Sequence, residues 1–204
     1  MPVQVEVPDY EVADRLTVEP DRSVLLIVDM QNDFAREGGA LYNPAAAATI
    51  PTIRDLSDGA RDAGVPVWYT QDTHYEGDPE WDVWGRHAER ETPGWEIVDE
   101  LAPGPGDRVF EKSHYDGFYG TGLDAALRAA HRTCLVIVGT VANICVHYTA
   151  ASAGLRFYDV IHPVEAISAL TEFDRHAAFR QASWLFGARL VHADGLGFGS
   201  GPAA

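Results

Sequence analysis

The chain has 204 residues, of which 46% are hydrophobic and 23% charged, a balance typical of one globular domain. Its formal net charge of −16 argues against surfaces that bind nucleic acid or anionic membranes, because those surfaces need clustered basic residues. No apolar run reaches the roughly 20 residues of a membrane span, the N-terminus is acidic where a signal peptide is basic, and two cysteines suit a reducing compartment, so we expect a cytoplasmic protein.

The first part of the chain predicts an arm, a strand, a helix and a second strand. Residues 1–20 alternate apolar and polar side chains around three prolines, which suggests an N-terminal arm lying on the domain or on a partner subunit. Residues 23–28 are a serine followed by five apolar residues and lead to the carboxylate of Asp29, which is typical of a buried parallel strand. A helix is expected over 45–63, ending before Gly64, and a strand over 65–69.

The remainder continues this alternation after a long loop. Residues 71–94 are polar, aromatic and rich in turn residues, and loops of this length in compact domains are usually functional or disordered. Further helices are expected over 95–101, 122–130 (with Thr121 as N-cap), 144–154 and 174–186, and strands over 108–111, 133–138, 159–164 and 189–192. Residues 195–204 are rich in glycine and predict a flexible tail.

The alternation of strands and helices predicts the fold class. We expect a single-domain α/β fold over residues 21–194, with a doubly wound sheet of about six mainly parallel strands and helices on both faces. Ligands bind such sheets outside the carboxyl ends of the strands. Asp29, Asp72, Lys112 and the turn 139–145 all follow predicted strands, so we expect them to converge on one crevice.

Cys145 is a candidate nucleophile because it follows a buried strand and a turn that begins with glycine, at the start of a helix. Free backbone N–H groups and the positive end of the helix dipole favour a thiolate there. The same N–H groups can hold the oxyanion that forms when a thiolate attacks a carbonyl. The alternative is a small buried core residue, the role that we assign to Cys134.

Asp29 and Lys112 are candidate partners of that thiol. A carboxylate at the end of the first strand could accept the thiol proton and later return it to a leaving amine; the alternative for Asp29 is a helix cap or a loop hydrogen bond. Lys112 is the only lysine among 15 basic residues. A compact ammonium between the two would stabilise both anions and lower the thiol pKa, although chance could also have left one lysine.

The long loop carries a candidate metal site. Asp72 and His74 are two residues apart and point to the same side of an extended chain, and His87 could fold back as a third ligand. One carboxylate and two imidazoles leave positions open for water or substrate and suit zinc, iron or manganese. An isolated pair of this kind is more often part of a solvated loop.

Together these motifs resemble the isochorismatase-like cysteine hydrolases, which include nicotinamidases, N-carbamoylsarcosine amidases and ureidoacrylate hydrolases. The likeness covers about residues 22–192. It is carried by LLIVDMQNDF (25–34), YTQDTH (69–74), WGRHAERETPGWEIVDEL (84–101), FEKSHYDGFYGTGLD (110–124) and CVHYTAASAG (145–154). Several motifs in the same order are more specific than any one of them.

The resemblance implies a role for each matching residue. The catalytic triad of the family falls on Asp29, Lys112 and Cys145. The ligands of a divalent metal ion, expected to be zinc with iron or manganese as alternatives, fall on Asp72, His74 and His87. The aromatic residues that flank a nicotinamide ring fall on Phe34, Trp84 and Tyr115. A cis peptide between Thr140 and Val141 would turn the N–H groups of Val141 and Cys145 into an oxyanion hole.

The resemblance also implies a reaction, in which a small amide is hydrolysed through a thioester and releases ammonia. The first expectation for the substrate is nicotinamide, and the alternative is N-carbamoylsarcosine or a related ureido amide. Val141 and Ala142 depart from the small residue and threonine typical of nicotinamidases. A non-catalytic ligand-binding α/β domain is the alternative of another class, and the arm and family habit favour a homo-oligomer, a dimer or larger.

Overall fold

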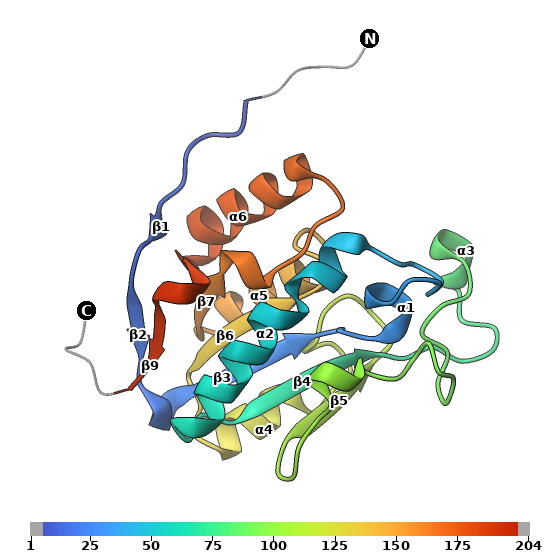
Figure 1. Cartoon of the computed structure of the whole chain (residues 1–204), viewed down its shortest axis with the longest axis horizontal. Helices are drawn as coiled ribbons and strands as arrows, with labels where there is room; N and C mark the ends of the chain where they lie inside the picture. Colours follow the sequence, from blue (N-terminus) through green and yellow to red (C-terminus); the bar gives the residue numbers. More distant parts are fainter. Residues whose placement is uncertain (1–5, 200–204) are drawn as a thin grey trace.

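The computed structural model describes residues 6–199 and shows a central sheet of seven parallel strands covered by helices on both faces (Figure 1). The strand order is β1-β8-β7-β6-β3-β4-β5. The strands are β1 (Val12–Ala13), β3 (Ser23–Val28), β4 (Val67–Asp72), β5 (Arg108–Lys112), β6 (Cys134–Gly139), β7 (Asp159–Pro163) and β8 (Arg189–Val191). The α/β fold predicted from the sequence is confirmed, with one strand more than expected.

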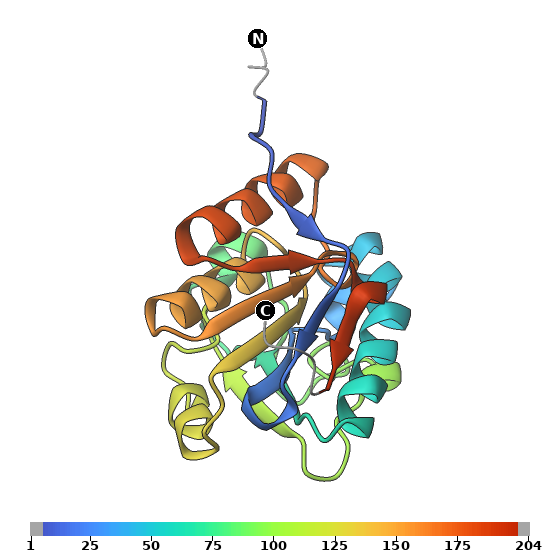
Figure 2. The ribbon, with the colours of Figure 1, turned by 90° about the vertical axis from the view of Figure 1, so that its left-hand side faces the viewer.

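Helices cover the two faces unequally. They are α1 (Asn32–Ala35), α2 (Pro44–Asp62), α3 (Trp81–Trp84), α4 (Leu123–Ala129), α5 (Cys145–Leu155) and α6 (Glu172–Phe186). In Figure 2, α2 lies on one side of the sheet and α4, α5 and α6 on the other. Alternate residues of β3 accordingly enter two cores, with Leu25 and Ile27 packing toward α2 and Leu26 toward the other three helices. This is why the strand is apolar from Val24 to Val28.

The order of the strands places the switch point of the sheet between β3 and β6. From β3 the chain adds β4 and β5 on one side, and then returns to add β6, β7 and β8 on the other. The carboxyl ends of β3, β4, β5 and β6 lead to Asp29, Asp72, Lys112 and the turn after Gly139. Ligand sites in open parallel sheets lie at such a point.

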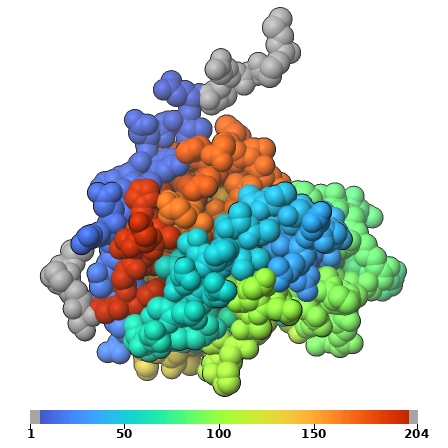
Figure 3. All heavy atoms as spheres, viewed as in Figure 1, coloured from blue at the N-terminus to red at the C-terminus, as the bar shows by residue number. Residues whose placement is uncertain are grey.

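Both ends of the domain carry strands that the sequence did not predict. Within the expected arm, β1 pairs with β8, and β2 (Leu16–Val18) pairs with β9 (Leu196–Phe198) inside the expected tail. Figure 3 shows these blue and red segments against each other. The glycines reflect close packing, because a Cβ on Gly195 would lie 1.8 Å from the Asp14 carbonyl oxygen. The last five residues of the predicted tail, 200–204, lie outside the described residues.

Other boundaries shift for local reasons. The helix expected over 95–101 is only a 3₁₀ turn at Asp99–Leu101. Gly122 precedes α4 without a side-chain cap, although the Thr121 hydroxyl accepts a hydrogen bond from the Leu123 N–H at 3.2 Å. Strand β4 runs on to Asp72 because its last residues pair with β5. None of the helices in residues 6–199 is long and apolar enough to cross a membrane.

The N-cap of α6 gives a first testable prediction. The Thr171 hydroxyl accepts a hydrogen bond from the Asp174 N–H at 3.1 Å. Thr171→Ala should lower the free energy of unfolding by about 1 kcal/mol because that N–H then loses its acceptor. Urea denaturation measures the change, and Thr171→Ser should retain most of the stability. Equal stability of the alanine and serine variants would contradict this assignment.

Candidate active site

Cys145 occupies the first position of α5, at the end of a turn that only a glycine can begin. Gly139 has φ +117°, and a Cβ there would lie 2.2 Å from the Val28 carbonyl oxygen. The peptide bond between Thr140 and Val141 is cis, at the position that the resemblance implied. Within residues 6–199, the N–H groups of Val141 and Cys145 donate to no backbone carbonyl. Both N–H groups are therefore free to donate hydrogen bonds to a substrate oxygen.

Lys112 lies at the centre of three candidate groups. Its Nζ is 2.8 Å from Asp29 Oδ2, 2.9 Å from Asp72 Oδ1 and 3.7 Å from Cys145 Sγ. Asp29 is also held by a hydrogen bond from the Thr70 hydroxyl to its Oδ1, at 2.8 Å. The structure thus brings the three residues of the expected triad together. It adds Thr70, which sequence reasoning missed because a threonine inside a buried strand carries no distinguishing pattern.

Burial and charge set the protonation of this group. Burial raises the pKa of the Cys145 thiol well above its ordinary value, with the Lys112 ammonium acting in the opposite direction. Burial likewise raises the pKa of Asp29 against the effect of Lys112. For Lys112, burial acts to lower the pKa, but the Asp29 and Asp72 carboxylates outweigh it, and the pKa is raised well above its usual range. Lys112 is therefore a permanent cation between its neighbours.

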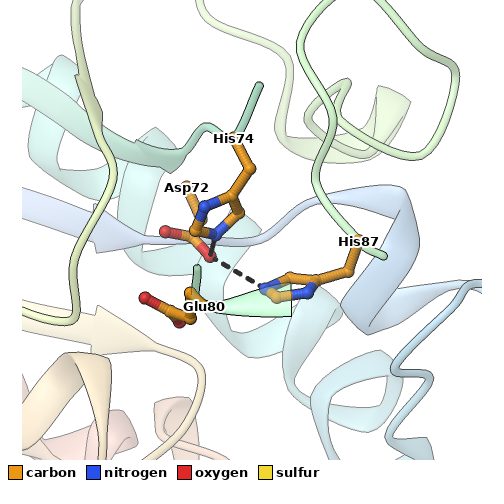
Figure 4. A group of neighbouring side chains, drawn as sticks. All are labelled: Asp72, His74, Glu80 and His87. Carbon is orange, nitrogen blue, oxygen red and sulfur yellow. Dashed lines mark hydrogen bonds and ion pairs between the residues drawn. The ribbon is translucent and has the colours of Figure 1, made fainter. Parts of the chain in front are cut away.

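Four side chains form a donor cluster beside Lys112: Asp72, His74, Glu80 and His87. One ligand atom from each lies within 4.8 Å of the others. Figure 4 shows the side chains converging, with Asp72 Oδ2 at 3.1 Å from His74 Nε2 and 3.6 Å from His87 Nε2. Three of the four were expected from the sequence. Glu80, which directly precedes α3, was missed because α3 is a single turn inside an irregular loop.

The orientation of the imidazoles fits a metal ion. His74 Nδ1 lies 2.9 Å from Asp78 Oδ2, and His87 Nδ1 lies 2.7 Å from the Gly85 carbonyl oxygen. Acceptors at Nδ1 hold a proton there and turn the Nε2 atoms toward the cluster, as outer-shell partners of metal ligands do. Two imidazoles and two carboxylates suit zinc, iron or manganese.

The charges of the donors support the same conclusion. Burial acts to raise the pKa of Asp72, but Lys112 and the two histidines outweigh it and hold the pKa far below its usual range. Burial acts to lower the pKa of His74, yet its hydrogen bond to Asp72, with help from Asp78, raises the pKa to about 9. The cluster therefore favours a positive charge, which a bound cation would supply.

Members of the Asp29–Lys112–Cys145 triad and of the donor cluster line one cavity of about 250 Å³. This volume is small for a ligand pocket and suits a small metabolite. The cavity wall contains the reactive candidates Asp29, Asp72, Glu80, His87 and Cys145. The aromatic residues expected from the resemblance, Phe34, Trp84 and Tyr115, also line it. The Trp84 indole donates a hydrogen bond to the Tyr115 hydroxyl at 2.9 Å. Leu41, Tyr42, Asn43, Thr140, Val141, Ile144 and Leu170 complete the wall.

Comparison with known proteins identifies the family. The isochorismatase domain family matches residues 23–194. The chain is 34% identical over 173 residues to the ureidoacrylate amidohydrolase RutB of Agrobacterium fabrum, covering 72% of this chain and 76% of that protein. N-carbamoylsarcosine amidase from Thermoplasma acidophilum is 39% identical, with a TM-score of 0.78, over 85% of this chain and 97% of that one. The pyrazinamidase of Pyrococcus horikoshii in complex with zinc is 27% identical, with a TM-score of 0.79, over 84% and 99%. The chain belongs to the isochorismatase family and is a hydrolase of carbon–nitrogen amide bonds.

Proposed function

We propose that this enzyme hydrolyses nicotinamide to nicotinate and ammonia, with Cys145 as nucleophile and a divalent metal ion beside it. The observation that carries the proposal is that the donor cluster and the Cys145 thiol open into one small cavity lined by aromatic side chains. A heteroaromatic amide has both a carbonyl for the thiol and a ring nitrogen for a metal. Zinc in the related pyrazinamidase supports the choice of metal.

The chain's own residues account for the covalent steps. Asp29 takes the proton of Cys145 while Lys112 compensates the negative charge that passes between them. The thiolate attacks the amide carbon, and the carbonyl oxygen becomes negative beside the free N–H groups of Val141 and Cys145. Asp29 returns the proton to the amide nitrogen, the carbon–nitrogen bond breaks, and ammonia leaves a thioester on Cys145. Asp29 then activates the water that cleaves the thioester and regenerates the thiol.

The donor cluster orients the substrate in this scheme. A metal ion held by Asp72, His74, Glu80 and His87 would supply a Lewis-acid position for the ring nitrogen. Phe34, Trp84 and Tyr115 would stack on or border the ring. Asp72 touches Lys112 through one carboxylate oxygen and the histidines through the other. It therefore fixes the distance between the nucleophile and the ring site.

A second candidate substrate is an N-carbamoyl or ureido amide. The relatives at 39% and 34% identity are an N-carbamoylsarcosine amidase and a ureidoacrylate amidohydrolase. Val141 and Ala142, just before the nucleophile, also depart from the nicotinamidase pattern. The same triad would attack such an amide, and that chemistry needs no metal that binds a pyridine nitrogen.

Ammonia release separates the two candidates. Zinc-loaded and chelator-treated protein would be assayed on nicotinamide, N-carbamoylsarcosine and ureidoacrylate. We expect nicotinamide to be hydrolysed by the loaded protein and its turnover to fall on chelation. If loaded protein leaves nicotinamide intact and hydrolyses a ureido amide with or without chelator, the second candidate replaces the first.

Metal binding by the cluster can be tested apart from activity. His87→Ala should lower zinc affinity by more than about tenfold, because a direct ligand is lost and even outer-shell changes cost about that much. Calorimetric titration with zinc measures the affinity. His192→Ala is the matched control, since His192 is exposed and pairs with Glu165 outside the cluster. Equal zinc affinity of the two variants would contradict the assignment.

A further inference from the structure

Ser168 contacts the turn after β6 through each of its polar groups. Its N–H donates to the Gly139 carbonyl oxygen at 3.0 Å, and its carbonyl oxygen accepts from the Ala142 N–H at 2.7 Å. Its hydroxyl donates to the hydroxyl oxygen of Thr140 at 2.8 Å. Ser168 is 2% exposed and Thr140 4%. The three bonds therefore reach residues on both sides of the peptide that carries the Val141 N–H.

The segment that carries Ser168 is itself anchored to the domain. It follows the 3₁₀ turn Val164–Ala166 after β7 and precedes Thr171, the N-cap of α6. The carbonyl oxygen of the next residue, Ala169, accepts a hydrogen bond from Asn43 Nδ2 at 3.3 Å, and Asn43 is the N-cap of α2. Ser168 is thus held between helices that lie on opposite faces of the sheet. It can therefore act as a fixed support for the turn.

The plane of the peptide between Thr140 and Val141 decides where the Val141 N–H points. Beyond this peptide, the carbonyl oxygen of Val141 accepts the N–H of Val146, in the first turn of α5, at 3.3 Å. Before it, the Thr140 N–H donates to the Val28 carbonyl oxygen at 3.0 Å, and the Thr140 side chain is held by Ser168. A hydrogen-bond donor stabilises an oxyanion best when it is already aimed at the position where the charge develops.

The hydroxyl is the part of Ser168 that depends on residue type. Any residue other than proline could make the two backbone bonds, whereas a side-chain donor is needed for the bond to Thr140. A buried hydroxyl costs free energy unless it is hydrogen-bonded. Here the partner of that hydroxyl lies directly before the residue whose N–H faces the substrate oxygen in the proposed reaction.

We propose that Ser168 is a positioning residue for amide hydrolysis. Its hydroxyl holds Thr140 so that the Val141 N–H points at the oxygen that becomes negative when Cys145 attacks. The inference rests on the proposed nucleophile and oxyanion hole, but it is independent of which amide is hydrolysed. Ser168 lies outside every sequence motif that carries the family resemblance.

Steady-state ammonia release by Ser168→Ala tests the inference, on whichever of nicotinamide, N-carbamoylsarcosine and ureidoacrylate the wild type hydrolyses fastest. We expect kcat to fall about tenfold to a hundredfold, because the donor is displaced, whereas outright loss of such a donor costs about a hundredfold to a thousandfold. KM should stay within about twofold of wild type, because the oxyanion forms only in the transition state.

Ser57→Ala is the matched control. Ser57 is also 2% exposed, and its hydroxyl donates to the Ile53 carbonyl oxygen at 2.7 Å within α2, outside the cavity wall. Both substitutions therefore remove one buried, hydrogen-bonded hydroxyl. Only Ser168→Ala should lower kcat.

Two further measurements separate positioning from a merely structural role. Alkylation of Cys145 by iodoacetamide uses the thiolate but forms no oxyanion, so its rate should be the same in Ser168→Ala and wild type. Thr140→Val removes the other hydroxyl of the pair. The kcat values of Thr140→Val, Ser168→Ala and the double variant should agree within about threefold, because all three lack the same hydrogen bond, whereas independent effects would multiply.

Three outcomes would overturn the inference while leaving the proposed function intact. They are equal kcat of Ser168→Ala and Ser57→Ala, a fall in kcat matched by an equal fall in the alkylation rate, and losses that multiply in the double variant. A wild type that hydrolyses none of the three amides would overturn the proposed function, and the inference with it. If circular dichroism shows that Ser168→Ala does not fold, Thr140→Val decides alone, with the same expected fall in kcat.

Discussion

Replacing Cys145 by alanine should abolish amide hydrolysis, with kcat reduced by at least about a thousandfold, because no other group in the cavity can form the acyl intermediate. The side chain is small and half-buried at the first position of a helix, so the fold should persist. Zinc content should also be unchanged, because Cys145 is not one of the donor residues. Ammonia release, thermal melting and metal analysis of the same preparation measure the three quantities.

Cys134→Ala is the matched control for that variant. Cys134 lies in β6 and its side chain packs in the core under α2, away from the cavity. Its removal should cost stability, by about 1 kcal/mol for the lost packing, and leave kcat close to that of wild type. Near-normal turnover by Cys145→Ala, or loss of turnover in Cys134→Ala at full folding, would contradict the assigned nucleophile.

Lys112→Met should remove activity and destabilise the fold together. The substitution leaves the buried Asp29 and Asp72 carboxylates without the ammonium that lies 2.8 and 2.9 Å from them. Breaking a buried ion pair by removing one partner costs about 3–5 kcal/mol. Urea denaturation of the metal-free proteins measures this loss, and ammonia release measures the activity.

The loss of stability in Lys112→Met should become larger as the pH rises. Burial already raises the pKa of Asp29 in the folded protein, and the Lys112→Met substitution removes the strongest influence that opposes this rise. A carboxyl whose pKa is raised on folding binds more protons in the folded than in the unfolded state, so its contribution to stability falls as pH rises. The difference between Lys112→Met and wild type should therefore grow with pH above the ordinary range of a carboxyl group.

Arg61→Met is the control for the loss of a cation. Arg61 pairs with Asp107 at 2.7 Å but is partly exposed, so its removal should cost no more than about 1 kcal/mol. Equal destabilisation by the two substitutions would show that Lys112 does not compensate buried charge. Full activity of Lys112→Met would exclude it from the mechanism.

The parallel sheet and the convergence of the site residues could be predicted from the sequence for a physical reason. Strands buried on both faces read as continuous apolar runs, and parallel strands end at one edge, so Asp29, Asp72 and Lys112 had to converge once their strands were recognised. The register between β4 and β5, which sets Asp72 opposite Lys112, could not be read from either strand alone. It depends on the packing of the whole sheet.

The roles of Glu80, Gly195 and Thr70 could not be recognised from the sequence around them. Glu80 enters the donor cluster through the path of an irregular loop, which no periodicity encodes. Gly195 lies in a glycine-rich segment that composition interprets as flexible, whereas the structure uses the absent Cβ for close approach to Asp14. Thr70 becomes informative only when its hydroxyl is seen against Asp29. For Gly195 and Thr70 the deciding contact joins residues far apart in the chain.

Alkylation of the thiols, followed by peptide mass spectrometry and residual ammonia release, tests the central claim most directly. If Cys145 is the nucleophile, it should react with iodoacetamide near neutral pH much faster than the buried Cys134. Activity should fall in proportion to the fraction of Cys145 modified, and bound substrate should slow both changes. Protein that is fully alkylated at Cys145 and still releases ammonia at the original rate would contradict the account.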